Sequence, residues 1–221
     1  MSDLKPHKRT NDILLGPLER PALAWLAKHM PAWMTPDRLT GIGTLGAGLA
    51  FAGYWLSGLN RQFLWLAVLG IVVNWFGDSL DGTMARYRRI ERPRYGYFVD
   101  HTVDAFNQCL IIIGLGLSPY VRFDIACLLL IGYLLMSILV HIRTYIDGVF
   151  KISYGRFGPT EARVILCMST LSMLSTNLKS FRVGSDVFSV YDICTGVITA
   201  ALYIMFICSA VQQAKTLARL E

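Results

Sequence analysis

The stretch that decides the fold is residues 78–104, which read DSLDGTMARYRRIERPRYGYFVDHTVD. Apolar runs flank it on both sides. The aspartates near its two ends therefore lie where a residue that faces lipid should be uncharged. Ionisable side chains inside membrane segments are costly, so they usually mark a functional site and need a partner. Four aspartates here need one: Asp78, Asp81, Asp100 and Asp104.

The composition around this stretch is that of a membrane protein. Of the 221 residues, 54% are hydrophobic and only 16% are charged, whereas soluble domains carry about 25% charged residues. A membrane-spanning helix needs about 20 mostly apolar residues. We therefore predict an all-α polytopic protein with six transmembrane helices. Their apolar windows are residues 39–59, 62–77, 105–121, 125–142, 164–178 and 193–213.

The segment before the first window predicts a helix that lies in the membrane interface. Apolar residues recur at helical spacing in it, while Arg20 and Lys28 are available for the wet side. The helix would anchor the chain to the membrane or, alternatively, help to cover a groove for a lipid substrate. We divide the chain into a cytosolic N-terminus with this helix, residues 1–35, and a transmembrane domain, residues 36–221. The apolar positions are Leu18, Ala22, Trp25, Leu26 and Trp33.

The positions of the basic residues predict the orientation. Of the 21 Lys and Arg residues, only Arg61, Arg122, Lys179 and Arg182 lie in the connections on one side. By the positive-inside rule, both termini and residues 78–104 are cytosolic, and the cell's inner membrane is the expected location. Topology and attraction to anionic lipid account for the net charge of +6, so we expect no nucleic-acid partner.

Helical geometry predicts that the four aspartates meet. Asp78 and Asp81 share one face of the second predicted helix, and Gly96, Asp100 and Asp104 share one face of the third. At a rise of about 1.5 Å per residue, the returning helix brings Asp100 to the level of Asp81. It brings Asp104 to the level of Asp78, one turn deeper.

Four carboxylates that meet between two membrane helices are either protonated or bound to cations, because like charges repel and burial of a charge costs free energy. Oxygen ligands suit Mg²⁺, Mn²⁺ or Ca²⁺ better than zinc. Two divalent ions would neutralise the cluster, and such a pair can grip a phosphate group. Gly82 and Ala85 leave the same helix face without bulk, and Arg86 can contact phosphate oxygens.

The motif D-x2-D-G-x2-A-R followed by G-x3-D-x3-D resembles the signature of the CDP-alcohol phosphotransferase family. Residues 35–40, TPDRLT, resemble the TPN-x-L-T opening of the first span, with Asp37 in place of Asn. Nine residues separate Arg86 from Gly96, slightly more than is usual in the family. The extra length falls in the basic turn YRRIERPRY, where Pro93 ends any helix.

The resemblance implies a reaction in which an acceptor hydroxyl attacks a CDP-linked alcohol at phosphorus and releases CMP. It implies Mg²⁺ or Mn²⁺ as cofactor, with two ions, and a homodimer. It makes Asp104 the general base and an additional metal ligand. The principal metal ligands would be Asp78, Asp81 and Asp100, and the nucleotide would lie against Gly82, Ala85, Arg86 and Gly96.

Two donor classes stay open. The sequence DHTVD, with His101, and GPTEAR at residues 158–163 resemble the choline and ethanolamine phosphotransferases, which use diacylglycerol as acceptor. The chain length resembles bacterial and archaeal members, which combine CDP-diacylglycerol with a small polar acceptor. His101 could also simply hydrogen-bond a neighbouring aspartate. Four basic residues either bind an acceptor phosphate or only orient the protein: Arg143, Lys151, Arg156 and Arg163.

A cation transporter is the alternative function, because intramembrane acids also mark ion pathways. Residues 71–76 above Asp78 are apolar except for Asn74, and residues 109–113 beyond Asp104 are apolar, so the cluster has no polar continuation. A non-catalytic scaffold would not need four such acids.

Residues 41–46, GIGTLG, match a dinucleotide-binding pattern but follow no strand, and they fall inside a predicted span. We interpret the glycines there as positions of close helix packing. They are Gly41, Gly43, Gly46 and Gly48.

Overall fold

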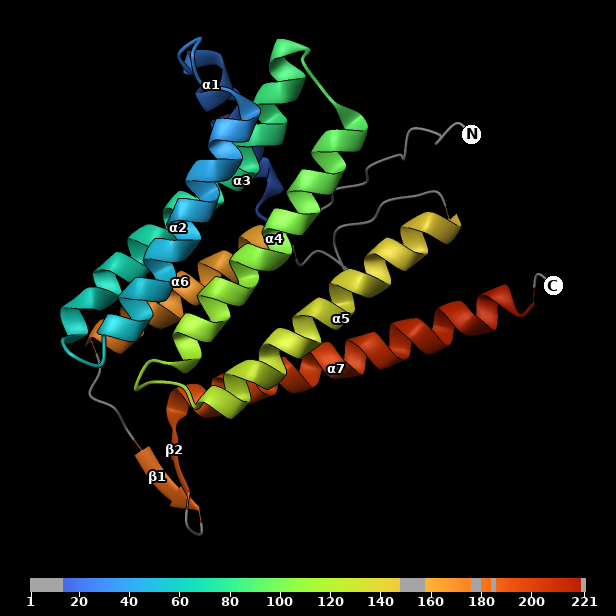
Figure 1. The fold of residues 1–221 in the computed structure, drawn as a ribbon. Helices are drawn as coiled ribbons and strands as arrows, with labels where there is room; N and C mark the ends of the chain where they lie inside the picture. The colour runs from blue at the N-terminus through green and yellow to red at the C-terminus, as the bar shows by residue number, and fades with distance from the viewer. Residues whose placement is uncertain (1–13, 148–157, 176–179, 184–185, 220–221) are drawn as a thin grey trace.

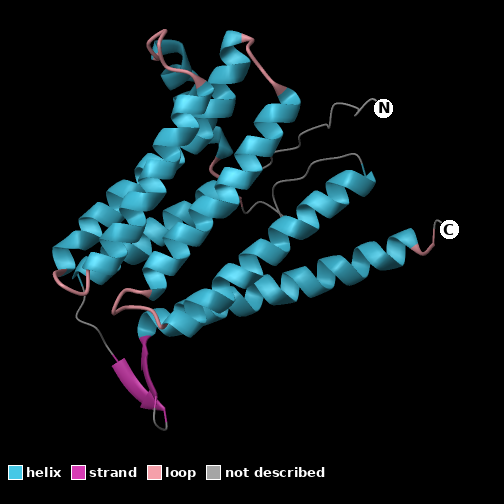
Figure 2. Ribbon diagram, in the orientation of Figure 1, coloured by secondary structure: helices cyan, strands magenta, loops and turns pink. Residues whose placement is uncertain are grey.

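The protein is mostly helical, as a computed structural model of the chain shows (Figures 1 and 2). The structure describes residues 14–147, 158–175, 180–183 and 186–219; Lys151 and Arg156 lie outside them. The helices are α1 (Gly16–His29), α2 (Pro36–Leu56), the short 3-10 helix η1 (Arg61–Phe63), α3 (Leu64–Arg88), α4 (Pro93–Gly116), α5 (Phe123–Asp147), α6 (Pro159–Ser175) and α7 (Val190–Leu217). The strands are β1 (Ser180–Val183) and β2 (Asp186–Ser189).

Within the described residues, four helical segments are long and apolar enough to cross a membrane. The other two predicted windows also form helices, α4 and α6. The first half of α4 carries the aspartates and other polar residues, and α6 has only 17 residues. The four segments are Pro36–Leu56, Arg61–Arg88, Phe123–Ile146 and Val190–Leu217.

The backbones of α2 and α3 approach closely at glycines. A Cβ atom on Gly46 would lie 2.4 Å from the backbone nitrogen of Asn74, and one on Gly77 would lie 2.4 Å from the nitrogen of Gly43. No real Cβ atom tolerates such distances, so only glycine allows this contact. The close-packing interpretation of Gly43 and Gly46 is thereby confirmed.

The same interpretation was wrong for two other glycines of α2. Among the described residues, a Cβ atom on Gly41 or Gly48 would meet no atom of another element within 4 Å. Both residues face away from Gly43 and Gly46, because successive residues advance about 100° around a helix.

The helices α1, α4 and α6 pack against this pair, and α5 and α7 lie beyond α4 (Figure 1). The helix α4 packs mainly against α2 and α5, α5 packs against α7, and α3 packs against α1 and α6. A buried hydrogen bond of 2.6 Å joins the hydroxyls of Tyr54 on α2 and Thr170 on α6. Because α2 contacts both α3 and α4, it sets the spacing of the two helices that carry the aspartates (Figure 1).

Local signals fix the helix ends near the aspartates. Pro36 occupies the first turn of α2, and the Thr35 hydroxyl accepts a 3.3 Å hydrogen bond from the Arg38 N–H. The helix α3 continues through Arg88 and ends where Arg89 takes a left-handed conformation with φ 55°. Pro93 then starts α4. The prediction that the chain turns near Pro93 is therefore confirmed.

The predicted N-terminal helix is α1. Leu23 and Ala27 are buried against α3, whereas Leu18 and Trp25 are 75% and 61% exposed. After α1, the Arg88 side chain donates to backbone carbonyls at Met30, Pro31 and Met34, the last at 2.5 Å. Arg88 thereby ties the α1–α2 connection to the end of α3.

A small β-hairpin departs from the all-α prediction. Strands β1 and β2 pair antiparallel, with Phe181 opposite Phe188 and their rings stacked at 6.1 Å. Ser189 and Asp192 then form a capping box that starts α7. The hairpin lies at the end of the molecule opposite α1 and the α3–α4 turn (Figure 1).

Candidate metal centre and active site

Three of the four aspartates form one group. Asp78 on α3 and Asp100 and Asp104 on α4 each offer a carboxylate oxygen, and these oxygens all lie within 4.8 Å of one another. The three side chains are partly buried. The expectation that carboxylates of these two helices converge is confirmed for this trio.

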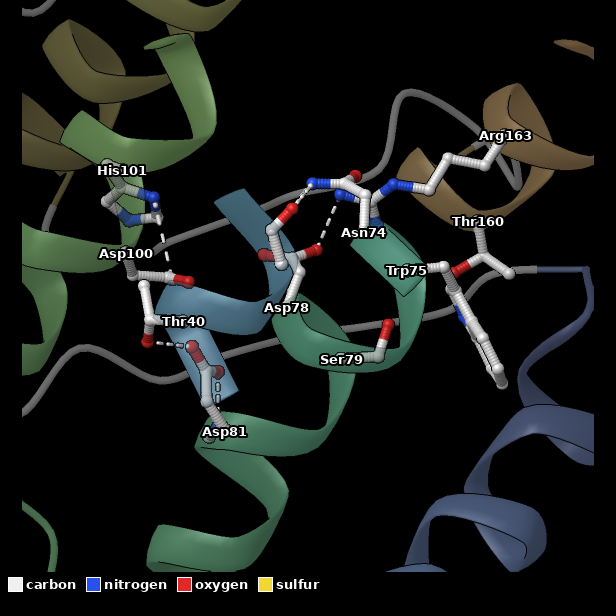
Figure 3. A network of polar contacts seen from close by, with 12 residues as sticks. Thr40, Asn74, Trp75, Asp78, Ser79, Asp81, Asp100, His101, Thr160 and Arg163 are labelled. Carbon is white, nitrogen blue, oxygen red and sulfur yellow. Dashed lines mark hydrogen bonds and ion pairs between the residues drawn. The ribbon is translucent and has the colours of Figure 1, made fainter. Parts of the chain in front are cut away.

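Asp81 is held apart from the trio by α2. The Thr40 hydroxyl donates a 2.6 Å hydrogen bond to Asp81 Oδ2, and the Gly82 N–H donates to Oδ1 (Figure 3). The predicted meeting of Asp78 with Asp104 is therefore confirmed, whereas the predicted pairing of Asp81 with Asp100 was wrong, because Asp81 lies outside the trio. Asp100 belongs with the deeper aspartates, because Thr40 draws the Asp81 carboxylate toward α2.

Arg163 enters the site from α6, which sequence reasoning did not expect. Its Nη2 atom lies 2.7 Å from Asp78 Oδ2, with the two side chains 8% and 18% exposed. Figure 3 shows the guanidinium reaching toward Asp78. Its Nε atom is buried and has no hydrogen-bond partner among the described residues. The predicted acceptor-phosphate residue is therefore a buried partner of a carboxylate.

The predicted nucleotide face lies beside the carboxylates and is open. A Cβ atom on Gly82 would meet the Arg86 guanidinium at 3.4 Å, and one on Gly96 would have no other atom within 4 Å. Arg86 also donates to the Thr83 hydroxyl at 3.3 Å. Ala85 is partly buried on the same helix. Nothing bulky from the described residues covers Gly96, which leaves room beside Asp100.

An aromatic cluster adjoins Asp100 between α4 and α5. The Tyr97 hydroxyl and His141 Nδ1 are 3.0 Å apart, and the rings of His101 and His141 are 4.7 Å apart between centroids. His101 Nδ1 lies 3.7 Å from Asp100 Oδ2, which is an ion-pair distance and too long for a hydrogen bond. Arg143 follows on α5 and is partly buried.

Comparison with known proteins identifies the family. The sequence model of the CDP-alcohol phosphatidyltransferases matches residues 33–209, which is most of the chain. The chain belongs to the CDP-alcohol phosphatidyltransferase family. The aspartate trio, Asp81 and the open glycines all fall inside the matched region.

Relatives within this family differ in their named activities. The chain is 36% identical to archaetidylinositol phosphate synthase of Pyrococcus horikoshii over 62% of this chain and 70% of that protein. It is 26% identical to cholinephosphotransferase 1 of Gallus gallus over 72% of this chain and 49% of that protein. It is 41% identical to phosphatidylinositol phosphate synthase of Cutibacterium acnes over 39% of each chain. The chain thus spans about half the length of the cholinephosphotransferase it matches.

Asp37, which stands where the family signature has Asn, has a specific contact here. Arg92 from the α3–α4 turn forms an ion pair with the Asp37 carboxylate. The hydrogen bond to Asp37 raises the pKa of Arg92. The turn between α3 and α4 therefore supplies the partner of Asp37.

Proposed function

We propose that this protein is a membrane-embedded CDP-alcohol phosphotransferase of phospholipid synthesis. The observation that carries the proposal is the convergence of Asp78, Asp100 and Asp104 within 4.8 Å, in a chain that the family model matches over residues 33–209. These three residues occupy three of the four aspartate positions of the family signature. Composition, helix lengths and phospholipid-synthesising relatives support the membrane setting.

The donor atoms of the site fit Mg²⁺ or Mn²⁺, because the converging ligands are all carboxylate oxygens. Asp78, Asp100 and Asp104 would hold the ions. Asp81, oriented by Thr40, would be the fourth carboxylate ligand, and the four carboxylates together would hold two ions. When bound, such ions neutralise phosphate oxygens and stabilise the displacement at phosphorus.

The chain's own residues would divide the remaining work. Asp104 accepts the proton of the acceptor hydroxyl while the oxygen of that hydroxyl forms a bond to phosphorus. The bond from that phosphorus to the oxygen of CMP breaks, and CMP leaves with the electron pair. Gly82, Ala85 and Gly96 give the cytidine nucleotide room, and Arg86 lies near its phosphates.

The donor is either CDP-diacylglycerol, used with a small polar acceptor, or a CDP-choline-like or CDP-ethanolamine-like compound, used with diacylglycerol. Relatives of both kinds match the chain. We propose Arg143, Lys151 and Arg156 for an acceptor phosphate, as all three come from the sequence between the starts of α5 and α6. Arg163 does not join them, because it pairs with Asp78.

The proposed architecture has six transmembrane helices, with α4 and α6 crossing beside the four longer segments. The helix α1 lies in the interface, supported by the exposed side chains of Leu18 and Trp25. Residues 1–35 form the cytosolic N-terminus and residues 36–221 the transmembrane domain. Both termini and the aspartates lie on the cytosolic side of the inner membrane. The family resemblance supports a homodimer.

The test is CMP release by the purified protein with Mn²⁺ and a panel of CDP-linked donors, each offered with its acceptor class. We expect one donor to release CMP, and Asp104→Asn to reduce the rate at least about a hundredfold, the lower end for a general base. Asp186→Asn, an exposed aspartate on the hairpin, is the control and should keep the wild-type rate. Metal-dependent cation flux into liposomes without CMP from any donor would favour a transporter instead.

A further inference from the structure

The ion pair between Arg163 and Asp78 is an unusual feature for a site that attracts divalent cations. The Arg163 side chain is buried and the Asp78 side chain is partly buried, and the contact between Nη2 and Oδ2 is 2.7 Å. A guanidinium stays protonated in proteins, so its burial is costly unless an anion accompanies it. Asp78 supplies that anion, and the Arg163 charge in turn offsets one of the four negative charges of the aspartates.

The first turn of α6 is fixed so that Arg163 points into the cluster. The Glu161 carboxylate accepts hydrogen bonds from the backbone N–H groups of Leu15 at 2.8 Å and Gly158 at 2.9 Å. The Thr160 hydroxyl donates to Glu19 Oε1 on α1 at 2.9 Å. Figure 3 shows Thr160 and Arg163 on neighbouring turns of this helix start. The position of Arg163 therefore rests on several contacts besides its own ion pair.

We propose that Arg163 is a positioning residue that orients Asp78 and weakens the site's hold on divalent ions. The proposal rests on the proposed function, since it requires the aspartates to bind such ions. Arg163 engages Oδ2 of Asp78, and the same carboxylate lies within 4.8 Å of those of Asp100 and Asp104, so the Arg163 charge adjoins the whole trio. A fixed positive charge beside the site repels a divalent cation, so Arg163 keeps metal binding reversible. The same charge pairs with Asp78 when no metal is bound, so that the partly buried carboxylate is not left unpaired.

The test compares the Mn²⁺ affinities of the wild-type protein and its variants in detergent. Electron paramagnetic resonance of free Mn²⁺ measures each affinity. Arg163→Met should bind Mn²⁺ at least about tenfold more tightly, because a repulsive unit charge is removed at short range. Arg163→Lys keeps the charge and should stay near the wild-type affinity. Arg61→Met is the matched control: Arg61 also contacts α6, through Met173 O at 2.8 Å, and should leave Mn²⁺ affinity unchanged.

Thermal unfolding gives a second readout that does not depend on activity. Metal-free Arg163→Met should unfold at a lower temperature than the wild type, and Mn²⁺ should raise its midpoint by more than it raises that of the wild type. Arg163→Gln is tested in parallel. Failure of both variants to fold in excess Mn²⁺ would overturn the proposal, since bound cations should replace the lost charge.

Other outcomes separate this inference from the proposed function. Unchanged or weaker Mn²⁺ binding by Arg163→Met, with normal binding by the wild type, would overturn the role of Arg163 alone. Equal tightening in Arg163→Lys would show that shape and not charge controls the affinity, and would also overturn it. A wild-type protein that binds no Mn²⁺ would instead remove the metal site from the proposed function.

Discussion

At the scale of single residues, the proposed metal site depends on a hydrogen bond that the Thr40 hydroxyl donates. It donates to Asp81 Oδ2 at 2.6 Å across the α2–α3 interface. Thr40→Val should lower CMP release about tenfold or more, because a hydrogen bond to a charged group contributes about 1.5–3 kcal/mol. Thr40→Ser should retain most of the rate, which an assay at saturating Mn²⁺ can measure.

Thr44 provides the control for this prediction. Its hydroxyl donates to the Thr40 carbonyl on the same helix at 3.1 Å and not to an aspartate. Thr44→Val should therefore leave CMP release close to wild type. Equal losses in the Thr40→Val and Thr44→Val variants would show that Thr40 acts through helix stability and not through Asp81.

The aspartates could be predicted from the sequence, but their partners could not. Helical periodicity places Asp78 and Asp104 on defined faces of their own helices. It does not reveal which third helix covers those faces. Thr40 and Arg163 come from α2 and α6, and only packing between helices brings them to the carboxylates. The place of Arg163 directly before an apolar window was a signal, although it also fitted an orientation charge.

At the scale of helices, the α2–α3 contact should be intolerant of a single methyl group. Gly46→Ala would place Cβ 2.4 Å from a backbone nitrogen of α3, which cannot rotate away as a side chain could. We expect a loss of about 1–3 kcal/mol in the free energy of unfolding. Thermal unfolding in detergent, followed by gel filtration, measures it.

Gly48→Ala is the matched variant, because its Cβ would meet no atom of another element within 4 Å in the described part of the chain. It should match the wild type or be slightly more stable, since alanine favours a helix over glycine. A Gly46→Ala protein as stable as Gly48→Ala would mean that α2 and α3 do not approach as closely as the structure has them.

Helices were easier to predict than strands. The apolar windows locate all six long helices because each holds many apolar residues in succession. Each hairpin strand has only four residues, so too few positions alternate to stand out from a polar loop. Gly41 and Gly48 were misread because glycine content does not reveal which side of α2 meets α3.

At the scale of the whole molecule, the aspartates and the hairpin should lie on opposite sides of the membrane. Glu91→Cys marks the α3–α4 turn, and Asp186→Cys marks the start of β2. A membrane-impermeant maleimide should label Glu91→Cys only from the cytosolic side and Asp186→Cys only from the other side. Labelling of both variants from one side would contradict the proposed orientation and the count of six spans.

The distribution of Lys and Arg predicted this orientation, because insertion responds to charge in the sequence. The pair of substrates could not be predicted in the same way. In the proposed function, the carboxylates and the glycines would serve the shared chemistry at phosphorus, whereas contacts outside the family motif would choose the acceptor. Relatives with different named activities match this chain.

The most direct test of the central claim is removal and stepwise return of the metal in a single sample. Protein stripped with a chelator should release no CMP from its donor, and the rate should recover in proportion to bound Mn²⁺. Asp100→Asn should recover neither full metal binding nor the rate. Undiminished CMP release in excess chelator, or wild-type Mn²⁺ binding by Asp100→Asn, would contradict the assignment of these carboxylates as the metal site of a phosphotransferase.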